Sequence, residues 1–282
     1  MTTPVHTTTS PFVLSFMSAN YVAEELGYGR ADDWGPFDDA ANAAYAPIET
    51  FAARFERLVE RIATIGFDAI DLWFGHLNWR WATPEHVALT RAALERHGVR
   101  VVSLAGSVGS TADELAAACR LASALGVDLI VGLGELVRSD RTGAASILRE
   151  HGVRFGLENH PERTPREVLD AIGVESDVLG AGLDTGWWAT QGYDPVAAIE
   201  ELSDRLFHVH LKDVEAVGAH VTCMYGEGCA RIADCVDALL RIGYSGPVSI
   251  EHEPYDRDPT AECARMLTAV REQISAEAVR RG

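Results

Sequence analysis

The chain has 282 residues, of which 47% are hydrophobic and 23% charged, a composition that excludes a disordered or low-complexity polymer. Its 24 Lys and Arg against 42 Asp and Glu give a net charge of −18, which opposes binding to nucleic acid or to an anionic membrane. Five cysteines without a CxxC motif indicate neither a disulfide framework nor a thiolate zinc site, and no apolar run is long enough to span a bilayer. A cytoplasmic protein with free thiols is expected.

Short β-type runs alternate with amphipathic helical segments along the chain. Residues 1–10 are Thr-rich, lack the features of a signal peptide and are predicted to form a disordered tail. Strands are predicted at 12–17, 67–73, 100–104, 129–132, 153–158, 180–184, 206–211 and 248–251. Helices are predicted at about 49–65, 84–97, 111–125, 142–151, 165–172, 195–203, 229–242 and 259–275.

This regular alternation predicts a single-domain (β/α)8 TIM barrel over residues 1–282. Several helices end in a glycine that leads into the next strand, and Thr83-Pro84 and Thr164-Pro165 mark helix starts. Eight strands and eight helices match the usual barrel of about 250 residues. An open doubly wound sheet is the alternative, but the chain has no GxGxxG after the first strand and no GxxxxGK[ST] motif.

The segment 20–47 interrupts the alternation. It is rich in Gly, Ala and Asp, is longer than an ordinary connection, and contains five aromatic residues, Tyr21, Tyr28, Trp34, Phe37 and Tyr45. We expect a long loop after the first strand that covers the mouth of the barrel. The alternative is a solvated insertion without a role at the site.

Four polar side chains end the last four predicted strands: Glu158, Asp184, His210 and Glu251. In a barrel of this type the working residues project from the carboxyl ends of the strands. Strand alternation places these four side chains on the face that looks toward the barrel axis, while their apolar neighbours face the helices.

Three carboxylates gathered in one small volume repel one another. At 4 Å and an effective dielectric constant of 20, each pair costs about 4 kcal/mol. A divalent cation bound by Glu158, Asp184, His210 and Glu251 relieves this repulsion, so the sequence predicts one metal ion. Oxygen-rich ligation favours Mn²⁺, with Mg²⁺, Co²⁺, Fe²⁺ and Zn²⁺ as alternatives.

The motifs at these strand ends resemble those of the xylose-isomerase-like barrels, a family of sugar phosphate isomerases and epimerases that includes inosose dehydratases. The resemblance rests on ENHP at 158–161, LDTG at 183–186, HVHLKD at 208–213, GYSG at 243–246 and IEHE at 250–253. It implies an enzyme in which the four matching positions bind one divalent ion. Glu158 and Glu251 double as proton carriers in that family.

The resemblance implies an isomerase or epimerase that acts on a ketose, a sugar phosphate or a keto-polyol through an enediolate. The alternative is a lyase or dehydratase of a keto-inositol or a 3-keto-sugar on the same site. A further alternative is DNA repair of the apurinic-endonuclease kind, which needs more histidines and is opposed by the acidic charge. A barrel that holds the ion without catalysis is also open.

Two departures from the ketose 3-epimerases argue against a standard ketohexose epimerase, and the Lys212-Asp213 pair and the Asn159-His160-Pro161 run resemble the inosose-dehydratase branch. The ketose 3-epimerases carry a His three residues past the strand-six aspartate and an Arg six past the strand-seven histidine, where this chain has Trp187 and Ala216. The candidate substrate-binding residues are Lys212, His160, Trp187, Glu253, Arg257 and His76. The expected partner is a small carbohydrate, and dimers or tetramers are common among similar barrels.

Overall fold

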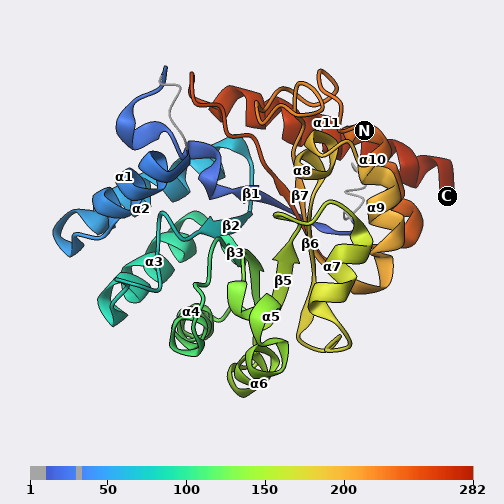
Figure 1. Cartoon of the computed structure of the whole chain (residues 1–282). Coiled ribbons are helices and arrows are strands. Elements are labelled where there is room, and N and C mark those ends of the chain that lie inside the picture. The colour runs from blue at the N-terminus through green and yellow to red at the C-terminus, as the bar shows by residue number, and fades with distance from the viewer. Residues whose placement is uncertain (1–10, 30–33, 282) are drawn as a thin grey trace.

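The computed structural model describes residues 11–29 and 34–281 and contains a closed barrel of parallel strands (Figure 1). The strands are β1 (Val13–Met17), β2 (Ala69–Trp73), β3 (Arg100–Ala105), β4 (Leu129–Gly132), β5 (Arg154–Glu158), β6 (Leu179–Asp184), β7 (Leu206–Leu211) and β8 (Pro247–Ile250). Each strand pairs with the next, and β8 pairs with β1. The predicted TIM barrel is confirmed, whereas the predicted tail at 1–10 lies outside the described residues.

The helices surround the strands, as Figure 1 shows. They are α1 (Trp34–Tyr45), α2 (Ile48–Ile65), α3 (Pro84–His97), α4 (Ala112–Leu125), α5 (Glu135–Ser139), α6 (Arg141–His151), α7 (Pro165–Ile172), α8 (Thr185–Thr190), α9 (Pro195–Glu201), α10 (Ile232–Ile242) and α11 (Thr260–Arg281). The eight predicted helices correspond to all of these except α1, α5 and α8. The last two have fewer than two turns, too short for a periodic pattern to show. In the part of the chain that is described, no helix has the length and apolar character needed to cross a membrane.

Local capping chemistry explains where the main helices begin and end. The Thr111 hydroxyl accepts a hydrogen bond from the backbone of Glu114, whose side chain bonds back to the Thr111 amide, which forms a capping box before α4. Gly98 and Gly243 follow α3 and α10 in the left-handed conformation, with φ of 65° and 70°. These glycines turn the chain back toward the next strand, as the sequence predicted.

The two faces of each strand follow the predicted alternation. Leu157, Leu183 and Val209 are fully or almost fully buried in the main core, which also contains the inner faces of the helices. The opposite face is crowded near the barrel axis, because a Cβ on Gly182 would lie 2.4 Å from Cγ2 of Val131. Small residues at this level leave room for the polar side chains at the strand ends.

The segment after β1 differs from the expected long loop. It contains two short 3-10 helices, Ser18–Tyr21 and Glu24–Leu26, and then α1. Phe37, Ala41 and Tyr45 are buried on one face of α1, at the four-residue spacing of an amphipathic helix. The expectation of a loop is therefore wrong for α1, because this spacing outweighs the Gly and Asp content. Trp34 and Asp38 of α1 line the large cavity described below.

Candidate active site

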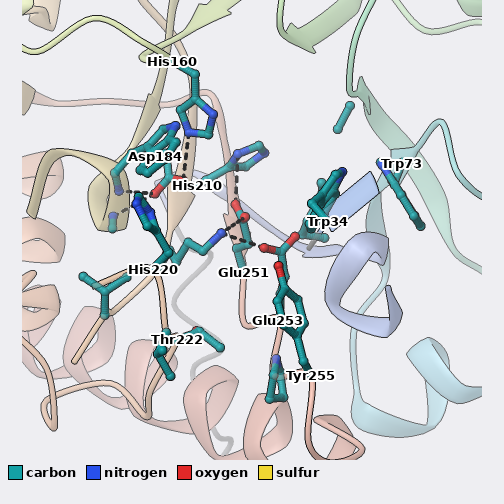
Figure 2. Close-up of a pocket in the computed structure, with 18 of the residues that line it drawn as sticks. Trp34, Trp73, His160, Asp184, His210, His220, Thr222, Glu251, Glu253 and Tyr255 are labelled. Carbon is teal, nitrogen blue, oxygen red and sulfur yellow. Dashed lines mark hydrogen bonds and ion pairs between the residues drawn. The ribbon is translucent and has the colours of Figure 1, made fainter. Parts of the chain in front are cut away.

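The structure brings the four predicted metal ligands to one end of the barrel, at the carboxyl ends of β5 to β8. Figure 2 labels three of them, Asp184, His210 and Glu251. Glu158 ends β5, Asp184 ends β6, His210 lies one residue before the end of β7, and Glu251 follows β8 directly. Asp184, His210 and Glu251 are buried, and Glu158 is partly buried. Parallel pairing in this register aligns Asp184 with His210, so neighbouring strands deliver their polar ends together.

The imidazole of His210 lies between two carboxylates. Its Nδ1 is 3.1 Å from Oε1 of Glu158 and 3.0 Å from Oε2 of Glu251. Ligand atoms of Glu158, His210 and Glu251 all lie within 4.8 Å of one another, and those of Glu158, His160 and Asp184 do the same. The two groups share Glu158, so five residues with potential donor atoms lie close together at this end of the barrel.

Asp184 is fixed so that one carboxylate oxygen remains available. Its Oδ1 accepts hydrogen bonds from the amides of Gly186 at 2.7 Å and Trp187 at 3.1 Å. Asn159 binds the backbone of Asp184 in both directions, through Oδ1 at 2.7 Å and Nδ2 at 3.2 Å. The other oxygen, Oδ2, lies 3.8 Å from Nε2 of His160. The strand-end asparagine and the start of α8 therefore hold this carboxylate in place.

The donor set fits a divalent cation. Oε2 of Glu251 and Nε2 of His160 are buried without a hydrogen-bond partner, although Oε2 lies 3.0 Å from Nδ1 of His210. Two donors that each lie about 2.1 Å from one ion, at a right angle, are about 3.0 Å apart. Oε2 of Glu251 and Nδ1 of His210 therefore have the spacing of adjacent ligands. Burial and the nearby Glu251 raise the pKa of Asp184 above its ordinary value. A cation would relieve that electrostatic cost.

Asp71 of β2 contacts the imidazole of His210 on the side opposite Glu158 and Glu251. The sequence analysis did not identify this residue. Its Oδ2 lies 2.8 Å from Nε2 of His210 and 3.2 Å from Nε2 of His208, and its Oδ1 accepts a hydrogen bond from Ser103 at 2.6 Å. Burial would raise the pKa of Asp71, but the two histidines outweigh it and hold the pKa well below its ordinary value. An ionised Asp71 accepts the proton of Nε2, which leaves Nδ1 of His210 facing Glu158 and Glu251. The only indication of this role in the sequence was that Asp71 is an acidic residue within an otherwise apolar strand.

Replacing Asp71 with Asn is expected to lower the affinity for Mn²⁺ by about 10- to 100-fold, because the His210 tautomer is no longer fixed. Titration calorimetry measures this affinity, with circular dichroism to show that the barrel is folded. Asp113→Asn, on the exposed side of α4, is the matched control and should leave the affinity unchanged. An Asp71→Asn protein that binds Mn²⁺ as tightly as the wild type contradicts this role.

The four predicted metal ligands line a cavity of about 1160 Å³. Five of the six predicted substrate-binding residues line this cavity: Lys212, His160, Trp187, Glu253 and Arg257. His76 does not line it. His76 is buried between Tyr45 and Trp73, with ring centroids at 4.6 and 5.1 Å, and burial lowers its pKa to about 3. A neutral imidazole inside an aromatic cluster has the environment of a core residue, and His76 therefore lies outside the candidate site.

Lys212 links the strand-end carboxylates to the wall of the cavity. Its Nζ lies 2.7 Å from Oε1 of Glu251 and 2.6 Å from Oε2 of Glu253. Burial would lower the pKa of Lys212, but these carboxylates raise it well above its ordinary value, so the ammonium is charged. Lys212 therefore orients Glu251 through one oxygen, while the other oxygen faces His210. The sequence analysis named Lys212 as a candidate substrate-binding residue, and the structure shows that Glu251 and Glu253 are its partners.

The five cysteines are all free thiols, and none lies in a group that could hold a metal within the described ranges 11–29 and 34–281. Cys223 and Cys235 are buried, and Cys229 is partly buried. Burial raises the pKa of each of these three thiols. They have the environment of small buried apolar residues.

Comparison with known proteins gives a consistent assignment of the fold. The family model described as xylose isomerase-like TIM barrel matches residues 59–273. Among curated proteins, the chain is 30% identical over 118 residues to an uncharacterised protein of Methanocaldococcus jannaschii, MJ1311, covering 38% of this chain. It is 28% identical over 131 residues to the rhizopine catabolism protein MocC of Rhizobium meliloti, covering 40% of this chain. The matches span about two fifths of the length of these relatives, 39% and 40%.

Solved structures with the same fold cover almost the whole chain. The probable 3-DHS dehydratase AsbF of Bacillus anthracis has a TM-score of 0.68 and 14% identity, over 92% of this chain and 98% of that chain. The IOLI protein with a bound zinc atom has a TM-score of 0.67 and 15% identity, over 94% and 99%. A D-allulose 3-epimerase from Methylomonas sp. with bound D-allulose has a TM-score of 0.65 and 17% identity, over 94% and 98%.

Proposed function

Because the chain belongs to the xylose isomerase-like TIM-barrel family, we propose that it is a divalent-metal-dependent isomerase or epimerase of a ketose, a sugar phosphate or a keto-polyol. One observation carries the proposal: Glu158 and Glu251 flank Nδ1 of His210 at 3.1 and 3.0 Å, at the base of an open cavity. Similar structures of a sugar epimerase and of a zinc-bound protein support it. Glu158, Asp184, His210 and Glu251 would hold the ion, with Mn²⁺ as our proposal for its identity.

When bound, a divalent ion would polarise a substrate carbonyl and acidify the neighbouring C–H bond. The protein contributes the proton transfer. One glutamate removes the proton from the carbon next to the carbonyl, and the electron pair moves onto the carbonyl oxygen to give an enediolate. The other glutamate delivers a proton to the opposite face, which inverts that carbon. Alternatively, one glutamate moves the proton between neighbouring carbons while the hydroxyl proton passes between the two oxygens, which shifts the carbonyl. Lys212 fixes the direction of the Glu251 carboxylate during both steps.

A second candidate reaction is dehydration of a keto-polyol at the same site. Trp187 lines the cavity at the position where the ketose 3-epimerases that this chain resembles carry a sugar-binding histidine. One of the similar structures is a probable 3-DHS dehydratase. In this reaction the enediolate would lose a neighbouring hydroxyl as water, with the proton supplied by a carboxylic acid at the site. The acidic lining of the cavity opposes the third alternative, a phosphodiester substrate.

Deuterium uptake from solvent tests the proposal and separates the two reactions. The Mn²⁺-loaded protein is incubated in D₂O with a panel of ketoses, inososes and 3-keto-glycosides, and products are followed by NMR and mass spectrometry. Isomerisation or epimerisation should place deuterium on the carbon next to the carbonyl without loss of water. Dehydration should remove one water molecule from the product. An epimerised product without deuterium at that carbon contradicts the enediolate mechanism with two glutamates, because the second glutamate delivers its own solvent-exchanged proton to the opposite face.

A further inference from the structure

The cavity is larger than the proposed sugar head alone requires. Its volume of about 1160 Å³ exceeds the range of about 300–1000 Å³ that is usual for pockets of drug-sized ligands. The carboxylates and imidazoles of the candidate metal site occupy its base, at the ends of β5 to β8. The remaining volume is therefore available to a second part of the substrate.

Trp34, Trp73 and Tyr255 form an aromatic wall of the cavity, next to the volume that the candidate metal site leaves free. All three belong to an apolar cluster that is separate from the main core. The rings of Trp34 and Trp73 lie 5.6 Å apart at 66°, and Tyr255 packs on Phe37 with centroids 4.8 Å apart. In Figure 2 this wall lies on one side of Glu251, and His160 and Asp184 lie on the other. Rings supported in this way present rigid apolar faces to a ligand.

The rim of the cavity is also apolar in two places. Leu133 is 38% exposed and Val221 is 56% exposed, and both line the cavity. They account for two of the five large hydrophobic side chains that are exposed in the described part of the chain. Apolar side chains at the mouth, with aromatic rings inside, favour a ligand that carries an apolar ring beyond its polar head.

The charge of the cavity opposes the binding of an anionic ligand. Nine carboxylate side chains line it against three lysine and arginine side chains. Lys212 is paired with Glu251 and Glu253, and Arg257 is paired with Glu262 and Asp256. Arg80 lies over the ring of Trp79 at 4.2 Å from its centroid. A bound divalent ion would leave the lining negative, so a phosphate group on the substrate would be repelled.

We propose that Trp34, Trp73 and Tyr255 form a subsite for the aromatic aglycone of an uncharged glycoside, and that the substrate is a neutral aryl glycoside of a keto-sugar. This inference rests on the proposed function, because the sugar ring of that glycoside would occupy the metal end of the cavity. It narrows the substrate class by excluding sugar phosphates and by requiring a second ring.

Binding of three glucosides to the full chain with Mn²⁺ tests the subsite by titration calorimetry. The probes are phenyl β-D-glucopyranoside, methyl β-D-glucopyranoside and phenyl β-D-glucopyranoside 6-phosphate, none of which has the carbonyl needed for turnover. The phenyl glucoside should bind at least about tenfold more tightly than the methyl glucoside, since its ring contacts the aromatic wall. The 6-phosphate should bind at least about tenfold more weakly than the phenyl glucoside.

Two variants locate the contact. Trp34→Ala should remove the preference for the phenyl glucoside, whereas Trp79→Ala, at a tryptophan that does not line the cavity, should retain it. Leu133→Glu, at an exposed rim position, tests the same contact independently of whether Trp34→Ala folds, and it should weaken binding of the phenyl glucoside. Val174→Glu, at a position that is 86% exposed, is its control. Equal binding of the phenyl and methyl glucosides, tighter binding of the 6-phosphate, or no glucoside binding overturns the inference. A parallel Mn²⁺ titration distinguishes these results from failure of the proposed function, which would appear as no metal binding.

Discussion

Replacing Glu251 with Gln is expected to lower kcat by about 10²- to 10⁴-fold while the barrel stays folded, because the amide cannot accept a proton from carbon. Glu158→Gln should have an effect of similar size, since the two carboxylates lie on either side of Nδ1 of His210. Both substitutions preserve side-chain volume, so the packing around the strand ends changes little. The measurement is steady-state turnover on the best substrate of the panel, at saturating Mn²⁺, with circular dichroism of each variant.

Glu227→Gln is the matched control for this prediction. Glu227 also lines the cavity, but it is exposed and belongs to none of the groups of candidate metal ligands. Its substitution should leave kcat within a few-fold of the wild type. Full activity of either Glu251→Gln or Glu158→Gln, with Mn²⁺ bound, refutes the role of that residue as a proton carrier. A variant that regains activity at higher Mn²⁺ has lost a ligand and not a base.

Removing the metal is expected to abolish turnover and to lower the thermal stability, and adding Mn²⁺ should restore both. Each pair of carboxylates at about 4 Å costs about 4 kcal/mol at an effective dielectric constant of 20, and a cation offsets this repulsion. A ligand present at a thousand times its Kd stabilises the folded state by about 4 kcal/mol. Dialysis against a chelator, followed by Mn²⁺ titration with turnover and Tm as readouts, checks both effects.

His210→Ala provides the comparison for metal removal. Without the imidazole between Glu158 and Glu251, added Mn²⁺ should raise the Tm by less than in the wild type. A wild-type protein that keeps full turnover after the metal has been removed, and whose Tm does not change on adding Mn²⁺, contradicts metal dependence. Parallel titrations with Mg²⁺, Co²⁺, Fe²⁺ and Zn²⁺ rank the ions by restored turnover, which tests our choice of Mn²⁺.

Most of the fold could be predicted from the sequence because its signals are local. The strand ranges 129–132 and 206–211 agree with β4 and β7 residue for residue, and the other strands differ at their ends. Strand alternation has a period of two, so a correct strand also gives the direction of Glu158, Asp184 and His210. The barrel rule that polar residues gather at the carboxyl ends of the strands then brought them together.

The sequence failed where a contact depends on segments that are distant along the chain. Asp71 meets His210 across 139 residues, and no local pattern connects them. His76 follows β2 and could have faced the mouth, yet the packing of Tyr45 of α1 against it places it in an aromatic cluster. The loop expected at 20–47 contains α1, whose buried face is defined only by what it packs against.

The sequence by itself determined the alternation of strands and helices and the four strand-end residues, because both follow from short-range periodicity and capping. Closure of the barrel decided the rest. It set Lys212 between Glu251 and Glu253, and it brought the aromatic wall from α1, β2 and the segment after β8 to one cavity. Such contacts are fixed by the packing of all eight units at once, which no single stretch of sequence encodes.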